Sequence, residues 1–178
     1  MAKRVRKPKG FDIDQVTDVY SVSNCLNNDF ADYINFWKHN AYWLFDSPDI
    51  IRSLAQENSI SLDRTLLFYY EVYEMEFDGA SWIGYEPEKS FGIDVQQPLT
   101  KALEGFDVVT FYARNSPEHS PLSCNGLANE IHANTHCLLD SFDVAYTTLT
   151  QGKFRNCEPG PYRIFAVYST PWPVQEFP

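Results

Sequence analysis

One stretch of the chain reads Thr65-Leu66-Leu67-Phe68-Tyr69-Tyr70-Glu71-Val72-Tyr73-Glu74-Met75-Glu76-Phe77. Aromatic and aliphatic side chains dominate it, which is typical of a β-strand, and before Glu71 both alternating sets of residues are apolar. A strand that is apolar on both faces is usually covered on both. We therefore expect a long central strand that starts in the core and emerges into solvent after Glu71.

Acidic side chains follow in the second half of this strand. Because side chains alternate along a strand, Glu74, Glu76 and Asp78 share one face, while Tyr73 and Met75 share the other. Such a stripe is a solvated strand end, a carboxylate site, or a surface whose charges steer a basic partner and whose aromatic groups hold it. The candidate binding residues are Glu71, Tyr73, Glu74, Glu76, Asp78, Trp82 and Tyr85.

Two helices are expected before the central strand. Residues 27–45 carry apolar side chains at three- and four-residue spacing after a capping asparagine, and Ser47-Pro48 begins a second helix that ends near Asn58. After the strand we expect short strands at 82–85 and 91–95 and a helix at 98–104. A strand at 106–113, a helix from Ser141 to Gly152 and a strand at 162–168 complete the pattern.

This order of elements predicts the α+β class. We expect one domain with a mixed or antiparallel central sheet, with the two N-terminal helices and further short helices packed on it. The length of 178 residues suits a single core, and 44% of residues are hydrophobic. Residues 1–10 are expected to be a basic flexible arm, 11–170 the globular domain and 171–178 a proline-rich tail.

Charge is the strongest bulk property. Five of the 14 basic residues lie in the first ten positions, so 9 basic residues face 24 acidic residues from position 11 onward, a balance of −15. Such a body repels nucleic-acid phosphates and attracts basic partners. No apolar stretch approaches the roughly 20 residues of a membrane span. With no signal core after the basic start, we expect a cytoplasmic protein whose cysteines stay thiols.

The segment 120–137 concentrates reactive side chains. Cys124 precedes a predicted short helix at 125–131, whose N-terminus favours the thiolate, and His132 or His136 is a candidate base. His119 is a further candidate base, with Asp140 or Glu130 to orient the imidazole. Zinc is a weaker alternative because the sequence has no Cys-x-x-Cys pair, and no glycine-rich phosphate loop is present. We expect neither a metal nor another cofactor.

Charge and aromatic content favour an intracellular protein-binding module. The hypothesis is an inhibitor or immunity-type protein that occludes a basic target such as a toxin or nuclease, and a non-enzymatic role is preferred. The alternative is a cysteine-dependent hydrolase or transferase that uses Cys124 with a nearby histidine.

Overall fold

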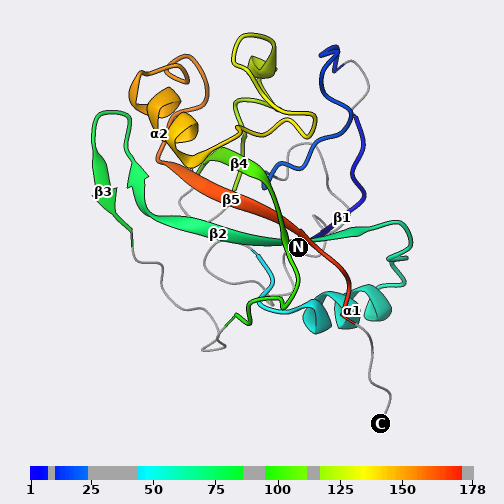
Figure 1. Ribbon diagram of the computed structural model, residues 1–178. Coiled ribbons are helices and arrows are strands. Elements are labelled where there is room, and N and C mark those ends of the chain that lie inside the picture. Colours follow the sequence, from blue (N-terminus) through cyan, green and yellow to red (C-terminus); the bar gives the residue numbers. More distant parts are fainter. Residues whose placement is uncertain (8–10, 24–43, 86–94, 112–116, 174–178) are drawn as a thin grey trace.

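A computed structural model describes residues 1–7, 11–23, 44–85, 95–111 and 117–173, and an antiparallel sheet forms its centre (Figure 1). Within these residues the strands are β1 (Ala2–Lys3), β2 (Leu66–Phe77), β3 (Trp82–Gly84), β4 (Ala102–Thr110) and β5 (Tyr162–Thr170). They pair in the order β1-β2-β5-β4, and β3 pairs with the far end of β2. The expected long strand at 65–77 is thus confirmed as β2.

The sheet curls because two of its pairings change register. The β2–β5 register shifts between Val72 and Glu76, and the β4–β5 register shifts between Leu103 and Gly105. Bulges of this kind bend a strand and increase its twist. Gly105 has φ +147°, and a Cβ there would lie 2.8 Å from atoms of 138–139, so a larger residue would be both strained and obstructed.

Different parts of the chain cover the two faces of the sheet. Phe165 and Val167 face one side and pack with apolar residues of the segment 20–22. Ile164 faces the other side and packs in the cluster that includes the buried residues of α2 (Phe142–Thr150). The other helix, α1 (Pro48–Glu57), packs near the start of β2. The two helices lie at opposite ends of the sheet (Figure 1).

Both helices begin where the sequence predicts. The Ser47 hydroxyl accepts a hydrogen bond from the Ile50 amide (3.3 Å), and the Ser141 hydroxyl accepts one from the Val144 amide (3.2 Å). Each serine thereby satisfies an amide that has no partner within its helix.

The predicted architecture with two N-terminal helices is wrong. The described residues form a curled antiparallel sheet of five strands with only the two α-helices α1 and α2. The expected helix at 27–45 lies almost entirely outside the described residues, and Leu44 and Phe45 at its end are not helical. The expected strand at 91–95 also falls outside them except for Val95, which is not in a strand.

Two further helices expected from sequence are not formed. Residues 102–104 belong to β4 because the bulge at Gly105 lets the strand continue past that glycine, which therefore does not end a helix. At 125–131 only the 3₁₀-helix Leu127–Asn129 forms. It follows Gly126, which has φ +70° and offers no side chain to cap a longer helix.

A buried polar network joins β4 to β1 and to the segment 20–23. Asp107 of β4 is fully buried, and its carboxylate accepts hydrogen bonds from the Ser21 hydroxyl (2.7 Å), the Val22 amide (2.8 Å) and the Ser120 hydroxyl (2.7 Å). Lys3 of β1 is 2% exposed and donates to the carbonyls of Ser21, Val22 and Ser23. The start of the expected flexible arm is therefore built into the fold.

Replacement of Phe165 by Ala should lower the free energy of unfolding by about 3–5 kcal/mol. The ring is 1% exposed and stacks on Phe111 with a centroid distance of 5.9 Å, so its removal leaves a cavity at the centre of the sheet. Denaturant unfolding measures the loss, and Val144→Ala, at an exposed position of α2, is the control. Equal stabilities of the two variants would remove Phe165 from the core.

Asp107→Asn should change how stability depends on pH. Burial raises the pKa of the Asp107 carboxyl above its ordinary value, so the folded chain holds this proton more tightly than the unfolded chain. Its contribution to stability is full below the unfolded pKa and is lost as pH rises through the folded pKa. The unfolding free energy of the wild type minus that of Asp107→Asn should therefore fall as pH rises from about 4.

Denaturant unfolding at a series of pH values measures this difference. Asp63→Asn, at an exposed carboxylate, is the matched control. A difference that stays constant with pH, or that grows as pH rises, would contradict the raised pKa.

Candidate functional site

The predicted acidic stripe is divided between different roles. Glu71 lies opposite Ala166 and Glu76 opposite Arg163, and because an odd number of positions separates them along β2, alternation puts the two carboxylates on opposite faces of the sheet. Glu76 accepts two hydrogen bonds from the Arg163 guanidinium, at 3.1 and 2.8 Å, and Arg163 is 2% exposed. Glu76 therefore neutralises a buried cation, and its role in partner binding stays a prediction.

The other two carboxylates of the predicted stripe, Asp78 and Glu74, are exposed but have different contacts. Asp78 is exposed but accepts hydrogen bonds from the amides of Ala80 and Ser81, both at 2.8 Å, and so closes the turn between β2 and β3. These bonds hold the pKa of Asp78 below its ordinary value. Glu74 is exposed as well. Only Glu74 and Asp78 of the four predicted acidic residues are exposed.

The three predicted aromatic binding residues are half-buried and pack against other side chains of the molecule. The Trp82 ring is stacked on Tyr146 of α2 with centroids 4.7 Å apart, and Tyr73 contacts the edges of Trp82 and Phe142. The Tyr85 ring lies 3.4 Å from the Arg163 guanidinium. These rings hold β2, β3 and α2 together, and the partner-binding role we assigned to them stays a prediction.

Cys124 is disulfide-bonded, and its partner lies outside the described residues. The expectation that all cysteines stay thiols is therefore wrong at this position. Its sulfur lies 3.5 Å from the Ser23 hydroxyl and 3.4 Å from the Ser120 amide, next to the Asp107 network. A sulfur in a disulfide has no thiolate to act as a nucleophile, so the catalytic role of Cys124 requires the reduced chain.

Cys137 and Cys157 are free thiols. Burial raises the pKa of the Cys137 thiol to about 12 and also raises the pKa of Cys157. Both groups are therefore protonated near neutral pH, and neither is an activated nucleophile.

His136 and His132, two of the three candidate bases, have separate carboxylate partners. His136 Nδ1 lies 2.6 Å from Asp18 Oδ1, and its ring stacks on Tyr20 with centroids 4.0 Å apart. His132 is exposed, with Nε2 3.5 Å from Asp140 Oδ2. The contacts of these imidazoles do not include Cys124, so the described geometry does not assemble the predicted catalytic set. The described residues also contain no group of three or more His, Cys, Asp or Glu side chains placed to hold a metal ion.

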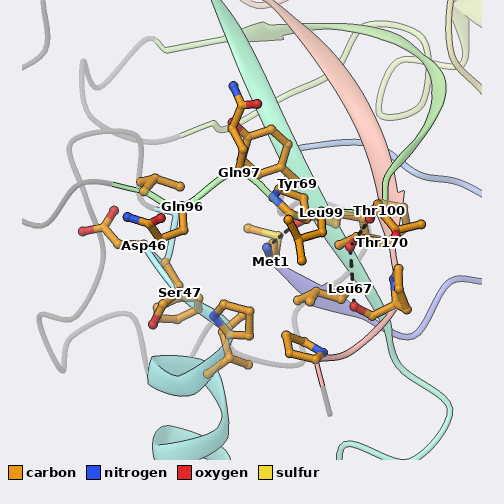
Figure 2. A pocket seen from close by; sticks show the side chains of 18 residues that line it. Met1, Asp46, Ser47, Leu67, Tyr69, Gln96, Gln97, Leu99, Thr100 and Thr170 are labelled. Carbon is orange, nitrogen blue, oxygen red and sulfur yellow. Dashed lines mark hydrogen bonds between the residues drawn. The ribbon is translucent and has the colours of Figure 1, made fainter. Parts of the chain in front are cut away.

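A mostly apolar pocket of about 480 Å³ (Figure 2) lies beside α1, which is at the opposite end of the sheet from α2 in Figure 1. Its walls come from the start of β2, the first turn of α1, the segment 95–100 and the end of β5. Leu67 and Ile51 form apolar parts of the wall, and Tyr69 also lines the pocket. The Thr170 hydroxyl donates to the Thr100 carbonyl (2.8 Å) and so ties the segment 95–100 to β5.

Exposed apolar side chains surround this end of the sheet. Leu99 is fully exposed on the pocket wall, and Val95 beside it is 44% exposed. Leu103 of β4 is 50% exposed and lies opposite Tyr168 in the β4–β5 register. Apolar side chains gathered on a surface next to a pocket commonly mark a binding site.

A cation lies among aromatic rings next to the pocket. The Lys101 ammonium is 4.7 Å from the Tyr69 ring centroid and 4.2 Å from that of Tyr168. It also donates to Glu71 Oε1, while the Tyr168 hydroxyl donates to Glu71 Oε2 (2.9 Å). The contact with Lys101 lowers the pKa of Glu71 and raises that of Lys101, so both stay charged near neutral pH. We call Tyr69, Glu71 and Tyr168 the cation cage.

Sequence reasoning found only part of the cation cage. Tyr69 and Glu71 are two residues apart on the predicted strand, so their shared face was available from alternation. Tyr168 and Lys101 reach them only through the β2–β5–β4 pairing, for which the chain carries no local signal.

Comparisons of the chain with protein-family models, curated proteins and solved structures find no match. Neither α-helix in the described residues has the length and apolar character needed to cross a bilayer.

Thiol counting tests the disulfide. Denatured protein without reductant should show two reactive thiols per chain, Cys137 and Cys157, and four after reduction, because the chain has four cysteines. Titration with a chromogenic disulfide reagent measures both numbers. Four thiols before reduction would restore Cys124 as a free thiol and with it the nucleophile hypothesis.

Proposed function

We propose that this protein is a binding module that occludes a basic protein partner, in the manner of an inhibitor or immunity protein. The observation that carries the proposal is the apolar pocket with its exposed rim at the α1 end of the sheet. Pockets of several hundred Å³ lined mainly by apolar groups are the usual form of a binding site. Here the exposed Leu99 and Leu103 extend the apolar surface beyond the pocket.

Charge supports a basic partner. The chain from residue 11 carries a balance of −15, and the contacts of Arg163 and Lys3 show that two basic side chains are buried inside the molecule. Among the described residues two acidic side chains, Asp46 and Asp107, are buried as well, so burial leaves the surface with the acidic balance of the chain. An acidic surface accelerates encounter with a basic protein, and the gain falls as salt screens it.

Binding would divide into steering and anchoring. Exposed carboxylates such as Glu74 and Asp78 attract the partner over a distance. An apolar side chain of the partner inserted between α1 and the segment 95–100 would then hold it, because buried anchors at the centre of an interface contribute most of the binding energy.

The described residues give the enzyme alternative no assembled site, and it stays a prediction from sequence. The disulfide at Cys124 is typical of an oxidising compartment, so the proposal does not include the expected cytoplasmic location.

Filling the pocket tests the proposal. Thr100→Trp places an indole at an exposed position of the pocket wall, and Thr147→Trp adds the same group to an exposed position of α2. The partner is first isolated from the source cells by crosslinking to the wild type and identified. Its dissociation should be at least about tenfold faster from Thr100→Trp, equivalent to about 1.4 kcal/mol, and unchanged for Thr147→Trp.

Two results would overturn the proposal. Equal dissociation rates for both variants would show that the pocket end does not contact the partner. An acidic partner, or an association rate that does not fall with added salt, would remove the role of charge.

A further inference from the structure

We propose that the cation cage of Tyr69, Glu71 and Tyr168 is a binding site for a lysine ammonium of the partner, and that Lys101 occupies it until the partner displaces it. This inference rests on the proposed function and names the chemistry of its contact. The cage is a second feature of the same surface, because Tyr69 belongs to both the cage and the pocket wall.

The geometry of the cage suits an ammonium ion. Tyr69 and Tyr168 are directly opposed on β2 and β5, with ring centroids 6.1 Å apart and planes inclined at 50°. An ammonium within about 6 Å of an aromatic centroid is attracted to the ring face. Glu71 lies two residues along the same strand and supplies a carboxylate to the same cation. The site thus offers two rings and one full negative charge.

Lys101 shows that the cage accepts a lysine. Its ammonium contacts all three cage residues, while its side chain remains 23% exposed. Lys101 lies just before β4, between the exposed segment 95–100 and the exposed Leu103. Its surroundings therefore leave room for the side chain to move out of the cage. The side chains of Lys101 and Glu71 are 23% and 39% exposed, so solvent reaches the ion pair and can hydrate Lys101 when a partner's ammonium displaces it.

The neighbouring pocket defines what must accompany the ammonium. Because Tyr69 lines the pocket, where Figure 2 shows it, and also contacts the caged ammonium, a ligand that fills both sites carries a cation joined to an apolar chain. A lysine flanked by an apolar residue on the partner has this form. The acidic body then adds attraction for the rest of a basic partner.

The probe is hexylammonium, with hexan-1-ol as its uncharged counterpart. Lys101→Met removes the internal cation but keeps an unbranched apolar side chain, and Lys101→Arg keeps a cation in place. Isothermal titration calorimetry should give about tenfold tighter binding of hexylammonium to Lys101→Met than to the wild type or Lys101→Arg. Hexan-1-ol should bind all three proteins equally. In a double variant that combines Lys101→Met with Tyr168→Leu or Glu71→Gln, the affinity for hexylammonium should return to that of the wild type.

Each other outcome has a defined meaning. Unchanged binding of hexylammonium to Lys101→Met, or an equal gain for hexan-1-ol, would overturn the cage and leave the pocket as a plain apolar site. If neither hexyl compound binds any variant, the pocket fails as an anchor and the proposed function loses its support. Tetramethylammonium then tests the cage alone: it should bind Lys101→Met and not the variant that also carries Tyr168→Leu, and failure of this difference would overturn the cage as well.

Discussion

The burial of one carboxylate, Asp107, is the constraint on which the fold depends. Burial of a carboxylate away from water raises the free energy of the folded state unless hydrogen-bond donors surround it. Asp107 has donors from Ser21, Val22 and Ser120, which come from two separate parts of the chain. Lys3 adds a buried ammonium that binds the carbonyls of the same segment. β1, the segment 20–23 and the loop before Cys124 are thereby fixed to β4, and removal of any one would leave buried polar groups without partners.

The same principle explains why two carboxylates of the predicted acidic stripe, Glu76 and Glu71, are paired with cations of the same chain. Placing Arg163 in the core between Tyr85 and Phe111 requires a counter-charge, and Glu76 supplies it from the adjacent strand. Glu71, on the opposite face, is matched with Lys101 instead. Charges that are close in sequence therefore have different roles, because alternation along β2 puts Glu71 and Glu76 on opposite faces, where each meets a different cation.

Local signals predicted the elements that depend on local physics. Ser47-Pro48 and Ser141 mark the starts of α1 and α2, and the apolar runs at 65–77 and 162–168 became β2 and β5. The helix expected at 98–104 failed because a glycine in a strand bulge and a glycine after a helix look alike in sequence. The partners of Glu71, Glu76 and Cys124 could not be predicted, since register and disulfide pairing are set by contacts between distant residues.

The distribution of basic side chains links the fold to the proposed site. Lys3 and Arg163 are buried, as are Asp46 and Asp107, so these four side chains leave the charge balance of the surface unchanged. Lys101 differs because its partners, Glu71 and two tyrosines, lie at the surface beside a pocket with an exposed apolar rim. An internal cation at this position lowers the local negative charge while no partner is bound. Its displacement by a partner's lysine would exchange one cation for another, so charge balance in the cage is preserved and the apolar contacts around it decide whether the partner stays bound.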